Sequence, residues 1–251
     1  MSLKLENIKW NLSDENGVNK EIIKDISLEF GDGKLIVVTG PNGGGKTTLA
    51  KLIAGVVTPS AGKILLEKDG IVTDITDINV TDRAKSGISY AFQQPVRFKG
   101  LTVRNLLETA AGRKMNKSEL CSLLGKVGLC AEEYLDREMN TSLSGGESKR
   151  IEIATVLARE TAISVFDEPE AGIDLWSFTK LVETFEEIRE ARKGTLIIIS
   201  HQERIISIAD DIVVIAGGKI KAFGPREEIL PTLLEDEKTV RCPIKAKGGN
   251  V

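Results

Sequence analysis

The chain has 251 residues, of which 41% are hydrophobic, and its formal net charge is −3. This composition supports a sizeable core in one or two domains and argues against non-specific nucleic-acid binding, which needs a basic surface. No apolar run approaches the length of a membrane span, and the first residues lack the pattern of a signal peptide. We therefore expect a cytoplasmic protein that binds no nucleic acid and does not insert into a membrane.

The hydrophobic pattern predicts alternating strands and helices. Strands are expected at residues 3–8, 21–30, 35–39, 62–67, 87–92, 163–167, 195–200 and 211–216, with a polar, turn-rich segment at 11–19. Helices are expected at residues 46–54, 103–111, 119–127, 144–159, 175–192 and 204–209. Strands separated by helices favour a parallel sheet with right-handed crossovers. The helices between 96 and 159 are then an insertion into an α/β core of residues 1–95 and 160–235, and residues 236–251 form a polar tail.

A glycine-rich loop, Gly40-Pro41-Asn42-Gly43-Gly44-Gly45-Lys46-Thr47, lies between an expected strand and an expected helix. Glycines let successive backbone N–H groups converge on an anion, and a helix N-terminus favours negative charge. Lys46 is predicted to reach the β- and γ-phosphates of a nucleotide, and the Thr47 hydroxyl is predicted to bind Mg²⁺. The residues of this loop expected to bind the nucleotide are Asn42, Gly43, Gly44, Gly45, Lys46, Thr47 and Thr48.

A second candidate site is the apolar strand 163–167, which ends in two carboxylates, Asp167 and Glu168. Asp167 is expected to support Mg²⁺, directly or through water. The side chain of Glu168 points the other way from the strand end, so it is predicted to orient and deprotonate an attacking water. The alternative is that both carboxylates simply face solvent at the strand end, and the presence of a phosphate loop in the same chain argues against it.

The segment Leu143-Ser144-Gly145-Gly146-Glu147 begins the strongest expected helix. Ser144 is placed to cap this helix and to hydrogen-bond a phosphate, and Gly145 and Gly146 let backbone N–H groups approach closely. Together with the phosphate loop and the acidic strand, this LSGGE segment resembles the signature of ATP-binding cassette (ABC) ATPases.

The resemblance to ABC ATPases covers about residues 3–234. It implies a P-loop NTPase fold with a mainly parallel sheet core, an antiparallel β subdomain and an inserted α-helical subdomain. It also implies ATP hydrolysis with ATP and Mg²⁺ as cofactors. In that family the LSGGE segment completes the nucleotide site of a second copy, so a nucleotide-dependent homodimer is expected.

Three further segments match the family. His201, the only histidine, follows an expected strand and matches the switch histidine that senses the γ-phosphate. Gln93 matches the Q-loop glutamine, which contacts Mg²⁺ or the attacking water and joins the core to the insertion; Gln94 is the adjacent alternative. The segment Ala171-Gly172-Ile173-Asp174 matches the D-loop, which lies along the dimer interface.

The branch of the family decides the partner. The segment from Asp167 to Asp174, with Lys99-Gly100-Leu101 after the Q-loop, resembles the SufC-type ATPases of iron–sulfur cluster assembly. That resemblance implies a SufB/SufD-like soluble scaffold as the partner. The alternative is the permease subunit of a membrane transporter, and a regulatory module without turnover is the weakest hypothesis. The partner surface is expected near residues 93–107, at positions such as Arg97 or Arg104.

Two smaller features stay open at this level. ABC ATPases commonly stack adenine on an aromatic residue near the end of the first strand, where this chain has Leu12. Trp10 lies two residues earlier, and both stacking on adenine and packing in the core are open to it. The three cysteines, Cys121, Cys130 and Cys242, show no pairing pattern and are expected to be free thiols.

Overall fold

The structure is a computed structural model that describes residues 1–13, 19–96, 98–140, 142–192 and 194–239. The described strands form a ten-stranded sheet in the order β5-β4-β1-β2-β10-β9-β3-β8-β7-β6. The strands are β1 (Ser2–Ser13), β2 (Asn19–Phe30), β3 (Leu35–Thr39), β4 (Ala61–Lys68), β5 (Ile71–Asp74), β6 (Ile88–Ala91), β7 (Ile163–Asp167), β8 (Thr195–Ile199), β9 (Asp211–Ala216) and β10 (Lys219–Pro225). The helices are α1 (Lys46–Ala54), α2 (Val80–Lys85), α3 (Val103–Ala111), α4 (Lys117–Lys126), α5 (Ala131–Tyr134), α6 (Gly145–Ala158), α7 (Leu175–Glu190), α8 (Glu203–Ile206) and α9 (Arg226–Thr239).

The central part of the sheet is parallel. Strands β9, β3, β8, β7 and β6 are paired in parallel, and every residue of β3, β7 and β8 is buried. Because successive side chains point to opposite faces, Val37 packs in one hydrophobic cluster and Val38 in the other. Parallel pairing brings the carboxyl ends of β3, β7 and β8 to one edge of the sheet, where open α/β sheets bind ligands.

The other half of the sheet is mostly antiparallel. β1 pairs antiparallel with β2 and with β4, and β4 pairs antiparallel with β5. β10 joins the halves, because it pairs antiparallel with β9 and meets β2 in a single parallel pair, Lys219 with Asp25. Helix α1 buries Leu49, Ile53 and neighbouring residues in the same hydrophobic cluster as β1 and β2.

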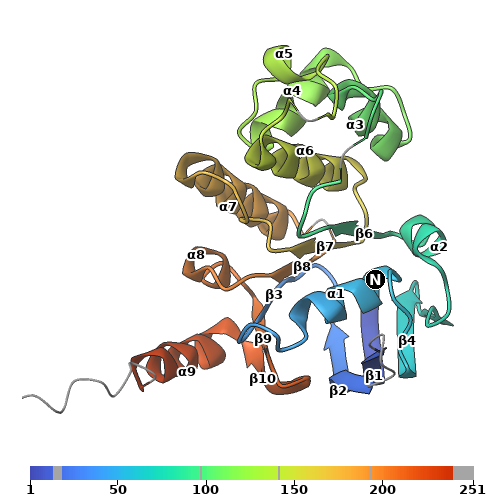
Figure 1. Ribbon diagram of the computed structural model, residues 1–251, viewed down its shortest axis with the longest axis vertical. Helices are drawn as coiled ribbons and strands as arrows, with labels where there is room; N and C mark the ends of the chain where they lie inside the picture. Colours follow the sequence, from blue (N-terminus) through green and yellow to red (C-terminus); the bar gives the residue numbers. More distant parts are fainter. Residues whose placement is uncertain (14–18, 97, 141, 193, 240–251) are drawn as a thin grey trace, which may run out of the picture.

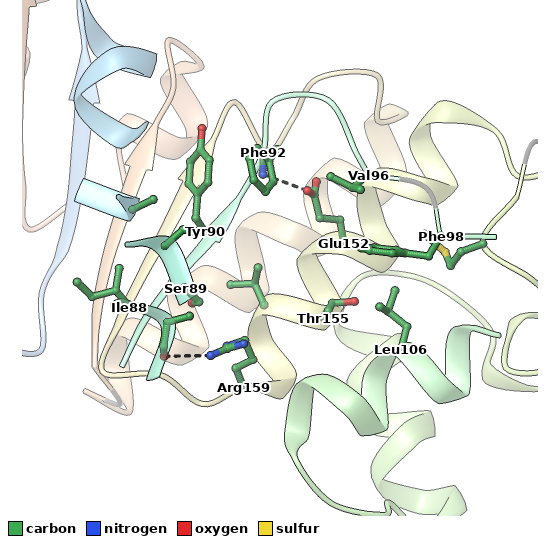
Figure 2. Close-up of a pocket in the computed structure, with 15 residues that line it drawn as sticks. Ile88, Ser89, Tyr90, Phe92, Val96, Phe98, Leu106, Glu152, Thr155 and Arg159 are labelled. Atoms are coloured by element: carbon green, nitrogen blue, oxygen red, sulfur yellow. Dashed lines mark hydrogen bonds between the residues drawn. The ribbon is translucent and has the colours of Figure 1, made fainter. Parts of the chain in front are cut away.

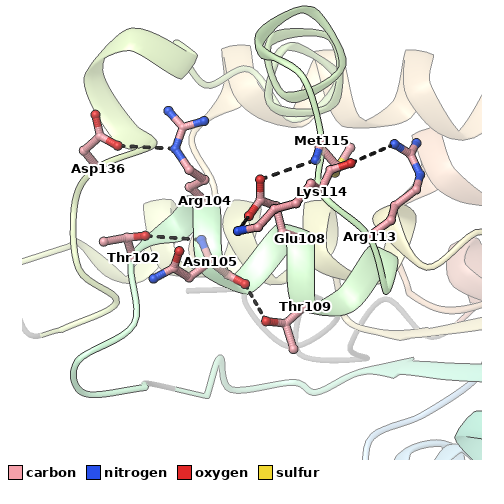
Figure 3. A network of polar contacts seen from close by, with 9 residues as sticks. All are labelled: Thr102, Arg104, Asn105, Glu108, Thr109, Arg113, Lys114, Met115 and Asp136. Carbon is pink, nitrogen blue, oxygen red and sulfur yellow. Dashed lines mark hydrogen bonds and ion pairs between the residues drawn. The ribbon is translucent and has the colours of Figure 1, made fainter.

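The inserted helices lie at one end of the sheet, where α6 packs against β6 and β7. Figure 1 shows α3, α4, α5 and α6 gathered at one end of the molecule, beyond the edge strand β6. The surface of α3 carries a network of polar contacts, drawn in Figure 3, in which Nε of Arg104 lies 3.5 Å from Oδ1 of Asp136. Arg104, which was expected to face a partner, is half-buried and forms this ion pair. Arg97, the other arginine expected there, lies outside the described residues.

The sequence missed several elements. The elements that were not predicted are β5, α2, α5, β10 and α9. Most of them are short or largely exposed, and α9 contains Pro231, so their hydrophobic pattern is weak. The turn-rich segment 11–19 is partly strand, because β1 runs to Ser13 and β2 begins at Asn19; residues 14–18 lie outside the described residues. Helix α8 is shorter than expected.

The expected tail and cysteines are described only in part. α9 reaches Thr239, so the predicted polar tail begins as helix, and residues 240–251 lie outside the described residues together with Cys242. Cys121 and Cys130 are free and exposed. Among the helices that the structure describes, none combines the length and apolarity that crossing a bilayer requires.

Candidate active site

The phosphate loop turns between β3 and α1 through backbone conformations that favour glycine. Gly40, Gly43 and Gly45 have φ angles of 129°, 75° and 108°. A Cβ atom on Gly40 would lie 2.1 Å from the carbonyl oxygen of Ile215, so a larger residue there would displace β9. The loop thus opens at the N-terminus of α1, where unpaired N–H groups can bind an anion.

Lys46 lies folded over this loop. Its Nζ donates to the carbonyl oxygens of Gly40 and Pro41, at 2.7 Å and 3.1 Å. Burial lowers the pKa of the ammonium group, and the carboxylates of Glu168 and Asp167 act in the opposite direction. A bound phosphate would offer this cation a stronger acceptor than either carbonyl oxygen.

Asp167 is fully buried at the end of β7 and accepts hydrogen bonds at both carboxylate oxygens. Thr47 Oγ1 donates to Oδ1 at 3.1 Å, and the Tyr90 hydroxyl donates to Oδ2 at 3.0 Å. Burial raises the pKa of Asp167, and both hydrogen bonds pull it down. Burial, with the nearby Asp167, raises the pKa of Tyr90, so its hydroxyl stays protonated as a donor.

The oxygen atoms of Thr47 and Asp167 are ligands that suit a hard divalent cation. Mg²⁺ is usually bound through one or two carboxylates together with substrate phosphates. Thr47 Oγ1 and Asp167 Oδ1 lie side by side at 3.1 Å and next to the phosphate loop. The chemistry of these donors therefore fits Mg²⁺ bound with a nucleotide.

Glu168 and Gln93 meet although they follow different strands. Nε2 of Gln93 donates to Oε2 of Glu168 at 2.7 Å. Glu168 has a φ angle of 46°, which is uncommon for a residue with a side chain and places the carboxylate beyond the end of β7. Gln94, the alternative to Gln93, is exposed and does not line the phosphate-loop cavity.

His201 follows β8 and is exposed at the rim of the same cavity. Beside it, Ser200 Oγ donates to Oε1 of Glu170 at 2.6 Å. Burial raises the pKa of Glu170, opposed by the hydrogen bond from Ser200, and its Oε2 is buried without a hydrogen-bond partner among the described residues.

One cavity of about 530 Å³ collects most of the predicted residues. Such a volume suits a small-molecule ligand. Its lining comprises Lys20, Ile22, Asn42, Gly43, Gly44, Gly45, Lys46, Thr47, Thr48, Gln93, Glu168 and His201. Trp10 is not among these residues; it is half-buried and packs against the core, which favours packing over stacking on adenine, and Leu12 is exposed.

The LSGGE segment does not line this cavity. Ser144 caps α6 in a capping box with Glu147, and the hydroxyl of Tyr134, which donates to Glu147, helps to lower the pKa of that carboxyl to about 2. A Cβ atom on Gly146 would lie 2.6 Å from the carbonyl oxygen of Gly172, so this segment packs tightly against the D-loop. Ser144 and Gly145 remain exposed in the single chain.

Sequence reasoning missed two polar residues of this region, Tyr90 and Lys149. Tyr90 lies near the end of β6, the strand that pairs with β7, and this position could have been noticed. Lys149 gave no signal, because a lysine in a helix is usually exposed. It is fully buried and donates to the backbone oxygens of Phe92, Gln93 and Asp167, and it ion-pairs with Glu152 at 3.4 Å.

Comparison with known proteins gives consistent matches. A family model described as ABC transporter matches residues 23–171. An uncharacterised ABC transporter ATP-binding protein of Methanocaldococcus jannaschii is 36% identical over 220 residues, which cover 84% of this chain and 86% of that protein. The energy-coupling factor transporter ATP-binding protein of Mycoplasma mobile is 32% identical over 91% of this chain and 81% of its own length. The lipopolysaccharide export system ATP-binding protein of Escherichia coli is 30% identical over 84% and 87%.

Solved structures agree on the fold. A dimeric ATP-binding cassette in a post-hydrolysis state with ADP and phosphate has a TM-score of 0.78 at 21% identity, covering 89% of this chain and 98% of the other. A nucleotide-free ATP-binding cassette from an ABC transporter has a TM-score of 0.76 at 26% identity, covering 96% and 98%. These likenesses confirm the predicted fold class.

Proposed function

This chain belongs to the ABC transporter family of ATP-hydrolysing cassettes, and from that premise we propose that it is the ATPase subunit of a membrane transport system. The observation that carries the proposal is the convergence of Lys46, Thr47, Gln93, Glu168 and His201 on one cavity at the carboxyl ends of parallel strands. The transporter ATP-binding proteins of Mycoplasma mobile and Escherichia coli favour this alternative over a SufC-like ATPase with a SufB/SufD-like scaffold.

We assign each residue one task in hydrolysis. The loop N–H groups and Lys46 hold the phosphates of ATP by charge and hydrogen bonding. Thr47 and Asp167 would hold Mg²⁺, which when bound neutralises phosphate charge. Glu168 accepts a proton from the attacking water, and Gln93 fixes the carboxylate that does so.

The signature segment supplies its contacts to a second copy. Ser144 and Gly145 are exposed at the start of α6, away from the phosphate-loop cavity of their own chain. In a two-fold symmetric pair, each copy would present this helix N-terminus to the γ-phosphate held by the other. His201 of the copy that holds the ATP, exposed at the rim of the cavity, would contact the same γ-phosphate. Because ATP would contact both copies, we expect it to stabilise the pair.

We place the transporter partner at an apolar cavity between the core and the helical insertion. Figure 2 shows this cavity, of about 230 Å³, between β6, the segment after it, α3 and α6. Val80, Val96 and Phe98 on its lining remain 47%, 41% and 39% exposed. The occupant we propose is an apolar helical segment of a membrane-embedded permease subunit. It would touch the chain segment that directly follows Gln93.

The test is co-purification from the organism's membrane and soluble fractions, combined with an ATPase assay. The chain should hydrolyse Mg-ATP and be recovered with an integral membrane protein. Phe98→Asp should abolish this recovery and keep basal hydrolysis. Val72→Asp, at an exposed apolar position on the distant strand β5, is the control and should retain the partner. Recovery of a soluble scaffold alone would overturn the transporter proposal in favour of the SufC-like alternative.

A further inference from the structure

Tyr90 connects two sites that the preceding sections treat separately. It lies on β6 opposite Val165 of β7, and it is one of the residues that line the apolar cavity. Its hydroxyl reaches Oδ2 of Asp167 at 3.0 Å. In Figure 2 the hydroxyl of Tyr90 points away from the cavity, whereas Phe92 lies next to its ring.

The hydroxyl has a specific effect on the geometry of Asp167. A carboxylate held at one oxygen can rotate about its last torsion, which is a broad and soft rotation. Asp167 is held at both oxygens, by Thr47 at Oδ1 and by Tyr90 at Oδ2. Tyr90 therefore keeps Oδ1 turned toward Thr47 and the phosphate loop.

We propose that Tyr90 is a positioning residue for the divalent cation: its hydroxyl fixes Asp167 so that Oδ1 and the Thr47 hydroxyl face the metal together. This inference rests on the proposed function of Asp167 as a metal-supporting residue. Tyr90 itself does not touch the metal or the nucleotide.

The ring of Tyr90 is fixed from the other side. Its centroid lies 4.6 Å from that of Phe92, with the planes inclined at 62°, an edge-to-face arrangement. The carbonyl oxygen of Phe92 accepts a hydrogen bond from the buried Lys149, and its N–H donates to Oε1 of Glu152 at 3.0 Å. A segment seated in the apolar cavity would thus press on the residue that orients Asp167, and partner binding would reach the metal site through one side chain.

The decisive variant is Tyr90→Phe, which removes the hydroxyl and keeps the ring. The matched control is Ser89→Ala on the same strand, since the Ser89 hydroxyl bonds Thr161 and Ser164 and not Asp167. We would measure ADP binding in EDTA, and then the Mg²⁺ concentration at which the unfolding temperature of the ADP complex is half-shifted. This readout needs neither turnover nor a transport partner, so it is independent of whether the transporter proposal holds.

Tyr90→Phe should raise the Mg²⁺ concentration needed for the half-shift about tenfold or more, as loss of a residue that orients a metal ligand predicts, without changing ADP binding in EDTA. Ser89→Ala should leave both values unchanged. Equal Mg²⁺ requirements in Tyr90→Phe and wild type would overturn the proposal.

A second measurement covers the case in which Tyr90→Phe does not fold. The chain has 2 tyrosines, so Tyr134→Phe leaves Tyr90 as the only one. Adding Mg²⁺ to its ADP complex should perturb the near-ultraviolet absorbance of tyrosine, because the Asp167 carboxylate that Tyr90 bonds acquires a cation. An unchanged tyrosine spectrum at saturating Mg²⁺ would contradict the assignment.

Discussion

Nε2 of Gln93 donates a 2.7 Å hydrogen bond to Oε2 of Glu168, across 75 positions of sequence. Gln93 lies at the start of the segment that leads from β6 into the inserted helices, two residues after the strand ends, and Glu168 directly follows β7. The proposed base is therefore held by the connection between the two parts of the chain. A displacement of the inserted helices would move the donor and release the carboxylate.

Glu168→Gln should slow ATP hydrolysis by about 10² or more, because the water loses the base that accepts its proton. ATP binding should persist, since the loop and Lys46 are untouched. Single-turnover hydrolysis and a nucleotide-binding assay separate these two effects. Hydrolysis near the wild-type rate would exclude Glu168 as the base.

Gln93→Ala and Gln94→Ala distinguish the two adjacent glutamines. Gln93→Ala should lower the hydrolysis rate by about tenfold or more, because Glu168 loses the hydrogen bond that positions it. Gln94 is exposed and does not line the cavity, so Gln94→Ala should retain the wild-type rate. Steady-state phosphate release measures both. The reverse order of effects would assign the Q-loop role to Gln94.

The chemical core of the site could be predicted from the sequence because it depends on short, contiguous segments. The phosphate loop and the end of β7 are each read from fewer than ten adjacent residues, and the buried parallel strands bring them together. The position of Glu168 beside Gln93 follows from strand order, which places β7 next to β6.

Other parts depend on contacts between distant segments. Lys149 is buried by Phe92 and Gln93, more than fifty positions earlier, and nothing in its local sequence signals this. Tyr90 meets Asp167 only because β6 and β7 are in register. The polar, mostly exposed sequences of β10 and α9 resemble loops. Their structure comes from tertiary contacts, because β10 pairs with β9 and α9 packs against both strands.

Trp176 should report formation of the dimer. It is 85% exposed in the first turn of α7, two positions after Asp174, which caps that helix. The other tryptophan is Trp10. In Trp10→Phe carrying Glu168→Gln, Mg-ATP should shift the remaining tryptophan emission to shorter wavelength as Trp176 becomes covered, and EDTA should reverse the shift. Sedimentation should show the same transition. A dimer that forms without any change at Trp176 would place the interface elsewhere.

Glu170→Gln tests how the buried carboxyl that accepts a hydrogen bond from Ser200 affects stability. Because burial raises the pKa of Glu170 in the folded protein above the ordinary glutamate value, ionising this carboxyl in the folded state costs free energy as the pH rises above that ordinary value. The free energy of unfolding of wild type, relative to that of Glu170→Gln, should therefore be lower at about pH 8 than at about pH 5. Urea unfolding at both pH values measures it, with the exposed Glu133→Gln as a control for loss of one charge. A pH-independent difference would show that Glu170 is not held in this way.

Arg83 should be a stability residue of the nucleotide-binding core. It is 1% exposed on α2, and it donates to the carbonyl oxygens of Leu52, Ile53, Thr76 and Ile78. Leu52 and Ile53 lie in the last turn of α1, so the cation also faces the negative end of the helix that begins at the phosphate loop. Burial lowers the pKa of Arg83 to about 10, which still leaves it charged at neutral pH.

Arg83→Met should lower the free energy of unfolding by about 3 kcal/mol or more, because it leaves buried carbonyl oxygens without donors. Arg83→Lys should recover only part of this loss, since one ammonium group cannot reach all four acceptors. Arg113→Met removes an exposed arginine paired with Glu119 at 2.8 Å, and this loss should be much smaller, because exposed ion pairs contribute little to stability. Urea unfolding of the four proteins decides the order. Equal losses in Arg83→Met and Arg113→Met would mean that the bonds from Arg83 to the end of α1 do not stabilise the fold.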